Sequence, residues 1–136
     1  MTTKDRYEGI QTILKACGEE GCHFLSLLSI AEEEEKTYID LIMAIRMFRS
    51  KGWLKPDFYV TDAVKILNFL TSKEWTREEV IKLPKEIADN QYTEVCYYNE
   101  KTGFRHFRRR YFDTLESSNT VKNGKIEKYY IYTCKG

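Results

Sequence analysis

The stretch that decides the fold runs Glu19-Glu20-Gly21-Cys22-His23-Phe24-Leu25-Ser26-Leu27-Leu28. Its first part is predicted to be a loop that ends at Gly21, and the rest a helix that Cys22 opens. A cysteine there lies near the positive end of the helix dipole, where unpaired N–H groups stabilise a thiolate and an oxyanion. The alternative is a small apolar residue at the edge of the core, as free cysteines often are. The helix is indicated by apolar residues at i, i+3, i+4 and i+7, namely Phe24, Leu27, Leu28 and Ala31.

Composition bounds the class of protein. The chain has 136 residues, of which 14% are aromatic and 32% charged, and this predicts a single folded domain over residues 1–136. The formal net charge of +1 gives no reason to expect an anionic partner. We find no signal-peptide core and no apolar run of membrane-spanning length, so a soluble, cytoplasmic protein with no membrane partner is expected. The cysteines are then expected to be reduced thiols, and no metal site is expected, because the chain has no C-x-x-C pair and only two histidines, His23 and His106.

Helical spacing of apolar residues predicts further helices around this one. The first covers about residues 4–16 and stops at Gly18. Another is capped by Thr37 and closed by Gly52, and a third is capped by Thr61. The acidic run 32–35 is interpreted as a solvated helix end.

The second half of the chain changes period. A short helix is predicted to start at Thr76 and to end before Pro84, because Thr76 and Glu79 fit a capping box. After it, residues 93–98 alternate as a strand does, residues 99–103 form a turn, and residues 104–112 are extended. The dipeptide Asn123-Gly124 predicts a hairpin before a last strand at 126–133. Helices followed by strands predict an α+β fold, with N-terminal helices packed on a C-terminal antiparallel sheet.

The run 105–110, Arg-His-Phe-Arg-Arg-Arg, has the most unusual local composition. Arginines interleaved with aromatic rings can grip phosphates and stack bases. We favour the simpler interpretation that these arginines lie on a solvated strand or turn and pair with glutamates, since the chain has no second basic patch.

Two blocks of sequence resemble a known family. The first block is Gly21-Cys22-His23-Phe24-Leu25-Ser26-Leu27-Leu28, and the second contains His106-Phe107, Phe112-Asp113 and Ser118-Asn119-Thr120-Val121-Lys122-Asn123-Gly124. Together they resemble small papain-like proteins of bacteria and phages, many of them uncharacterised. The resemblance implies a papain-like fold, with Cys22 as the nucleophile, His106 as the base and Asp113 as the acid that orients the base.

The chain departs from the papain-like pattern in one place. Papain-like enzymes place a glutamine shortly before the cysteine to complete the oxyanion hole, whereas this chain has Glu19 and Glu20 there. Carboxylates beside Cys22 would raise its pKa and repel an oxyanion. A domain that keeps the motif without catalysis is therefore a second hypothesis.

Strand geometry adds a condition to the triad. On one straight strand, His106 and Asp113 would be about 23 Å apart and on opposite faces. The triad therefore predicts a tight turn at residues 108–110, and Asn119 is the alternative third member because Cys-His-Asn triads also occur.

We expect a cysteine-dependent hydrolase or acyl-transfer enzyme that acts on a peptide, protein or small amide substrate without a cofactor. The alternative is a catalytically silent papain-like domain that binds a protein or a small anionic ligand. A third hypothesis is a winged-helix nucleic-acid-binding protein, whose recognition helix would follow Thr61. That helix carries Asp62, Lys65 and Asn68 but no arginine for reading bases, so this hypothesis ranks below the others.

Overall fold

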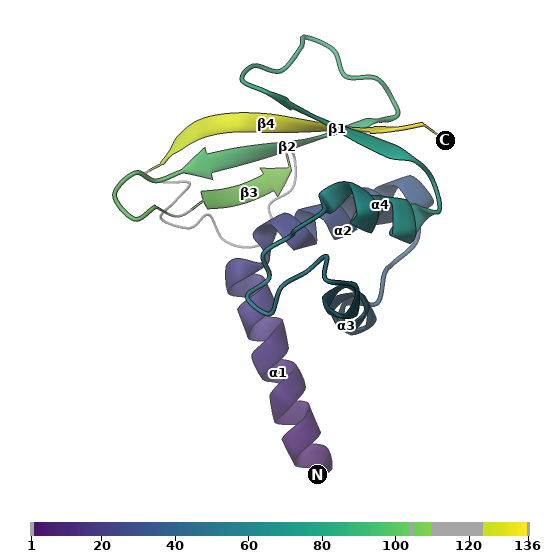
Figure 1. Ribbon diagram of the computed structural model, residues 1–136, viewed down its shortest axis with the longest axis vertical. Helices are drawn as coiled ribbons and strands as arrows, with labels where there is room; N and C mark the ends of the chain where they lie inside the picture. Colours follow the sequence, from purple (N-terminus) through teal and green to yellow (C-terminus); the bar gives the residue numbers. More distant parts are fainter. Residues whose placement is uncertain (1, 104, 110–123, 136) are drawn as a thin grey trace.

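A computed structural model describes residues 2–103, 105–109 and 124–135. Within these residues all the helices come first and all the strands follow, as Figure 1 shows. This order confirms the predicted α+β class. The elements are α1 (Thr3–Glu20), α2 (Cys22–Glu35), α3 (Leu41–Lys51), α4 (Ala63–Thr71), β1 (Trp75–Val80), β2 (Gln91–Tyr98), β3 (Arg105–Arg109) and β4 (Lys125–Cys134).

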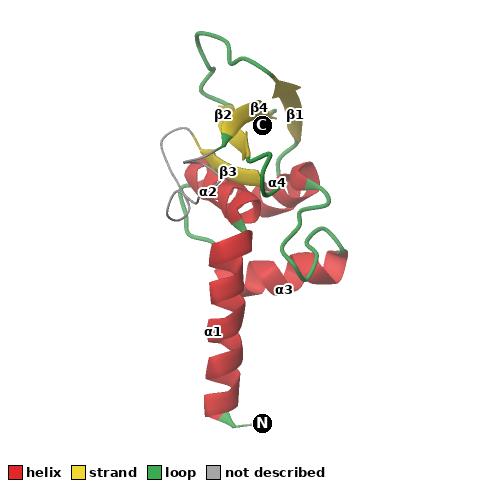
Figure 2. Ribbon diagram, turned by 90° about the vertical axis from the view of Figure 1, so that its left-hand side faces the viewer, coloured by secondary structure: helices red, strands yellow, loops and turns green. Residues whose placement is uncertain are grey.

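The strands form one antiparallel sheet in the order β1-β4-β2-β3. The last strand in the chain therefore lies inside the sheet, between β1 and β2. Its pairing with β2 shifts register at Cys96/Tyr97, where a bulge interrupts the ladder. Helices α2 and α4 lie against one face of this sheet, and α1 projects away from it (Figures 1 and 2).

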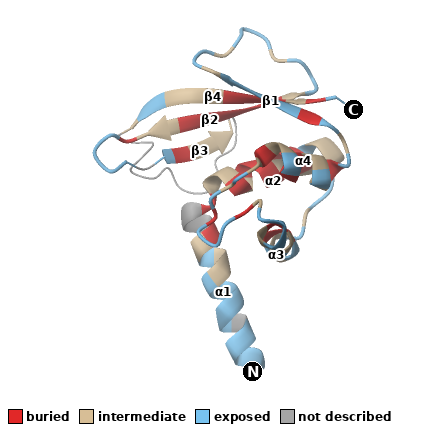
Figure 3. Ribbon diagram, viewed as in Figure 1, coloured by how far each residue is buried: buried red, intermediate tan, exposed pale blue. Residues whose placement is uncertain are grey.

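The core fills the space between the helices and the sheet. Helix α2 lies at its centre and packs against both α4 and β3. Figure 3 shows burial concentrated on α2, α4 and the middle of the sheet, while most of α1 is exposed. The buried side chains of α2 are Phe24, Ser26, Leu27, Leu28, Ile30 and Ala31, which include every apolar residue predicted to face inward.

Several predicted helix ends move by a few residues. Asp40 and Asp62 cap α3 and α4, because each carboxylate accepts the N–H of the residue three positions on. Thr61, the predicted cap, instead donates its hydroxyl to the Gly52 carbonyl at 2.7 Å. Gly52 closes α3 in the left-handed conformation, with φ of 76°, as predicted.

The short helix predicted to start at Thr76 is wrong, because Trp75–Val80 form strand β1. Its backbone pairs along its whole length with β4, from Trp75↔Cys134 to Val80↔Tyr129. Trp75 is buried against Tyr92, with ring centroids 5.6 Å apart. Long-range pairing thus outweighs a local capping signal worth only about 1 kcal/mol.

The acidic end of α2 is more than a solvated surface. Glu34 accepts the Tyr92 hydroxyl at 2.6 Å and an ammonium hydrogen of Lys73 at 3.3 Å. Glu33 forms an ion pair with Arg109 of β3. These contacts join the C-terminal half of α2 to the sheet.

The predicted strands and turn after residue 90 are confirmed where the structure describes them. Residues 99–103 turn with a hydrogen bond from the Gly103 N–H to the Asn99 carbonyl at 2.8 Å. The tight turn predicted at residues 108–110 is wrong at Arg108 and Arg109, because both continue β3 and pair with Val95 and Glu94. The hairpin predicted around Asn123-Gly124 has its first strand, residues 120–122, outside the described part of the chain. Of the helices described, none combines the length and apolar character needed to span a membrane.

Candidate functional site

The site begins where α1 and α2 meet at a single residue. Gly21 ends α1, donating to the Cys17 carbonyl at 2.7 Å, and its own carbonyl accepts the Leu25 N–H of α2 at 2.8 Å. There is consequently no loop before Cys22, and Glu19 and Glu20 are the last residues of α1. The prediction that Cys22 opens a helix is confirmed.

Gly21 is required at this junction because its surroundings leave no room for a side chain. A Cβ there would lie 2.5 Å from the Cys17 carbonyl oxygen and 2.9 Å from the Cys17 sulfur. The absence of a side chain lets α2 start directly against the end of α1. This close approach fixes the direction in which the first turn of α2 presents Cys22 and His23 to the sheet.

The Cys22 thiol is partly buried against β3. Its sulfur accepts the backbone N–H of Phe107 at 3.4 Å. Burial raises the pKa of the Cys22 thiol, N–H groups of Phe107, His23 and Cys22 oppose that rise, and the Glu94 charge adds to it. The resting group is therefore a neutral thiol, and nucleophilic attack would need a base to take its proton.

A base in the same pocket is His23. Its Nδ1 lies 2.8 Å from Oε2 of Glu94, a carboxylate with no solvent exposure. The other oxygen of Glu94, Oε1, accepts the Tyr132 hydroxyl at 2.9 Å. Burial, followed by the Glu94 charge, raises the pKa of Tyr132 well above its ordinary value, so this hydroxyl stays a donor.

These contacts fix the tautomer of the imidazole. An ionised carboxylate can only accept hydrogen bonds, so the proton of neutral His23 is on Nδ1 and Nε2 keeps its lone pair. The ring is held flat against Phe107, with centroids 4.3 Å apart, and lies 6.3 Å from Tyr130. His23 is thus oriented as a general base by a buried acid and two aromatic rings.

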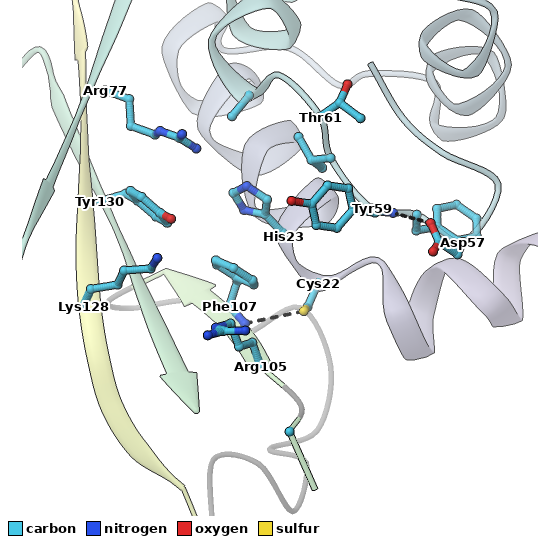
Figure 4. A pocket seen from close by; sticks show the side chains of 14 residues that line it. Cys22, His23, Asp57, Tyr59, Thr61, Arg77, Arg105, Phe107, Lys128 and Tyr130 are labelled. Atoms are coloured by element: carbon cyan, nitrogen blue, oxygen red, sulfur yellow. Dashed lines mark hydrogen bonds between the residues drawn. The ribbon is translucent and has the colours of Figure 1, made fainter. Parts of the chain in front are cut away.

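The pocket around this base has two unlike walls, which Figure 4 shows. On one side are Arg77 of β1 and both Lys128 and Tyr130 of β4. On the other side is the connection between α3 and α4, with Tyr59 and Thr61. Cys22, His23, Phe107 and Arg105 lie between these walls.

The predicted base is on the other face of the sheet. Phe107 faces α2, since its ring covers His23, and successive residues of a strand point to opposite faces. The buried side chain of His106 therefore points away from Cys22, toward the face that its pairing partner Tyr97 shares. β3 brings the backbone of Phe107 to the thiol, and it does not bring the His106 ring there. Asp113 and Asn119 lie outside the described residues.

Sequence reasoning missed His23, Glu94 and Tyr132. The sequence offered only part of the signal for Glu94, which alternation places on one strand face with Tyr92 and Cys96; the structure shows that both are buried. A carboxylate on a buried face needs a partner, and His23 is one of only two histidines in the chain. The alternation of β2 was visible in the sequence, but its inward face was not.

Comparisons of the chain with protein-family models, with curated proteins and with solved structures give no match. Among the described residues, no group of three or more His, Cys, Asp or Glu side chains is close enough to hold a metal ion.

Proposed function

We propose that this protein is a thiol-dependent hydrolase or acyl-transfer enzyme for amide or peptide bonds, with Cys22 as the nucleophile and His23 as the base. The observation that carries the proposal is the chain of contacts His23–Glu94–Tyr132 in the pocket that also holds the Cys22 thiol. The proposal keeps the function expected from the papain-like resemblance and assigns the base to a different histidine.

In the proposed reaction, Nε2 of His23 takes the thiol proton, directly or through one water, as the Cys22 sulfur attacks the substrate carbonyl carbon. The Glu94 carboxylate stabilises the imidazolium that forms. The leaving amine then takes that proton, and a thioester to Cys22 remains. A water activated by His23, or another acceptor nucleophile, cleaves the thioester and restores the thiol.

Backbone N–H groups supply the charge stabilisation that a glutamine usually provides. The α2 N-terminus has no side-chain cap, the Phe107 N–H donates to the thiol, and the N–H groups of His23 and Cys22 act to lower the pKa of the thiol. Donors that surround the sulfur are suitably placed to stabilise the oxyanion that forms next to it. The missing glutamine is therefore compatible with catalysis.

Acetylation by p-nitrophenyl acetate tests this assignment, because the reaction needs only a nucleophile and its base. We expect release of p-nitrophenolate and an acetyl group on Cys22, detected by mass spectrometry of peptides. Cys22→Ser should remove the adduct. His23→Gln should slow its formation by about 10²- to 10⁴-fold, the usual contribution of a general base.

The matched control is His106→Gln, which changes the other histidine on the opposite face of the sheet. It should leave the acetylation rate within about twofold, provided that thermal unfolding shows an intact fold. A loss of rate in His106→Gln but not in His23→Gln would restore the triad expected from the sequence. Acetylation rates of Cys22 equal to that of the wild-type protein in both variants would favour a domain that binds ligands without catalysis.

A further inference from the structure

The wall of the pocket formed by β1 and β4 is rich in cations. Arg77 and Lys128 line this wall, and Arg105 of β3 lines the pocket next to it. Tyr130 holds the two wall cations, since the Arg77 guanidinium lies 4.5 Å and the Lys128 ammonium 5.4 Å from the centroid of its ring. Tyr130 in turn stacks on Phe107, the ring that supports His23.

Two of these cations already have carboxylate partners. Arg105 holds Glu127 with two hydrogen bonds of 3.0 and 3.2 Å. Lys128 pairs with Glu79 at 3.0 Å and with Glu127 at 3.7 Å. Among the residues that the structure describes, Arg77 has no such ion pair, and its guanidinium is held in place over the Tyr130 ring.

Figure 4 shows the Arg77 side chain directed from β1 into the pocket, on the side of His23. A guanidinium fork that rests on an aromatic ring is pre-organised to bind a carboxylate through two parallel hydrogen bonds. The opposite wall provides the Asp57, Tyr59 and Thr61 side chains and no further cation. The Asp57 carboxylate accepts the Tyr59 backbone N–H at 3.1 Å, within its own loop, and forms no ion pair with Arg77 among the described residues.

We propose that Arg77 binds a carboxylate of the substrate, so that the enzyme acts on amides or peptides that carry a carboxylate close to the bond it cleaves. This inference rests on the proposed function for the bond-breaking step and on the pocket alone for recognition. One unpaired cation matches a group with one negative charge. A dianionic phosphate would need a second cation, and Lys128 and Arg105 are already neutralised by Glu79 and Glu127.

The inference is tested by binding to the Cys22→Ser protein, which cannot turn over the ligand. The probes are N-acetyl-glycyl-glycine and its C-terminal amide, which differ only in the carboxylate. Affinities are measured by NMR titration that follows the His23 ring signals. We expect the acid to bind about ten- to a hundredfold more tightly than the amide, the range for a hydrogen-bonded ion pair.

Arg77→Gln, made in the same background, should reduce the affinity for the acid to that for the amide. Arg46→Gln is the matched control, because it removes one positive charge from the exposed face of α3, outside the pocket. Equal affinities of acid and amide, no binding of either at millimolar concentration, or an unchanged preference in Arg77→Gln would each overturn the inference.

These outcomes are independent of the acetylation experiment. A carboxylate preference without acetylation of Cys22 would leave an Arg77 binding site in a protein that is not a thiol enzyme. Acetylation that depends on His23, without a carboxylate preference, would leave the proposed function and remove this substrate class.

Discussion

Glu94 is the residue whose position most needs a reason. A carboxylate without solvent exposure loses several kcal/mol of hydration, and here, among the residues that the structure describes, it regains hydrogen bonds from His23 and Tyr132. Apolar residues of similar volume often serve stability equally well at such places. A buried acid that ends on a histidine at a pocket wall therefore supports a role in proton transfer better than a role in stability.

The four thiols differ enough in burial to be told apart chemically. Cys17, Cys96 and Cys134 are at most 3% exposed, whereas Cys22 is only partly buried and lines the pocket. We predict that limited iodoacetamide treatment of the folded protein modifies Cys22 first. Because burial raises the pKa of Cys22, its rate should be below that of a free cysteine at about pH 7 and should rise steeply toward about pH 9.

Peptide mass spectrometry at several reaction times gives the order of modification, and a denatured sample is the control in which all four thiols react alike. First modification of Cys17, Cys96 or Cys134 would argue against Cys22 as the accessible nucleophile. A rate already at its plateau at about pH 7 would mean that the thiol is ionised at rest and needs no base.

Sequence could place Cys22, because a glycine before an apolar helical period is a local signal. It could not choose between His106 and His23. That choice depends on which of His106 and Phe107 faces the helices, and the register of β3 on β2 decides it. Both phases of an alternating strand look equally plausible when each contains aromatic and polar residues.

At the scale of elements, the junction of α1 and α2 controls the site. We predict that Gly21→Ala lowers the free energy of unfolding by about 1–3 kcal/mol, because its Cβ would clash with the Cys17 carbonyl and sulfur. The shift that relieves this clash moves the first turn of α2. Acetylation of Cys22 should therefore slow even in protein that remains folded, as measured by urea unfolding together with the acetylation rate.

Gly9→Ala is the matched control for this change. Gly9 lies inside α1, and a Cβ added there would have nothing within 4 Å. Alanine at this position should therefore stabilise the helix by about 0.5–1 kcal/mol. Equal stability of Gly21→Ala and the wild-type protein would show that the junction can relax without cost.

The elements also show where local signals are insufficient. The caps of α3 and α4 were predicted to within three residues, and the strand pattern of β2 and β4 was correct. β1 was not predicted, because the capping-box pattern in its sequence involves only a few adjacent residues. Its pairing with β4, in contrast, joins segments far apart in the chain. Non-local pairing leaves little trace in a window of six residues.

On the scale of the whole molecule, the pocket exists only after the chain is folded. Its walls come from α2, from the connection after α3, and from three strands of the sheet. Arg77 and His23 belong to segments that the sheet order brings together, with β4 placed beside β1. Composition and spacing cannot predict which segments of the chain become neighbours in this way. For this reason the sequence did not predict the pocket wall of β1 and β4 with its cations.

The core of the molecule contains several acidic groups that burial keeps protonated. Burial raises the pKa of Cys17 to about 11 and of Cys96 to about 12, and it also raises the pKa of Tyr92 and Tyr132. A raised pKa in the folded state means that folding holds the proton more tightly than the unfolded chain does. The stability linked to these groups is present below their ordinary values, 9.0 for the thiols and 10.0 for the tyrosines, and is lost as the pH rises above them.

We therefore predict that the free energy of unfolding is constant to about pH 8 and falls above about pH 9, by up to about 1.4 kcal/mol per pH unit for each thiol. Urea unfolding in the presence of a reductant, at intervals up to about pH 10.5, measures this decline. Cys17→Ala lacks one of the groups, so its stability should start lower because of the cavity but decline less steeply with pH. An unfolding midpoint that stays level to about pH 10.5 would show that these side chains gain solvent before the protein unfolds.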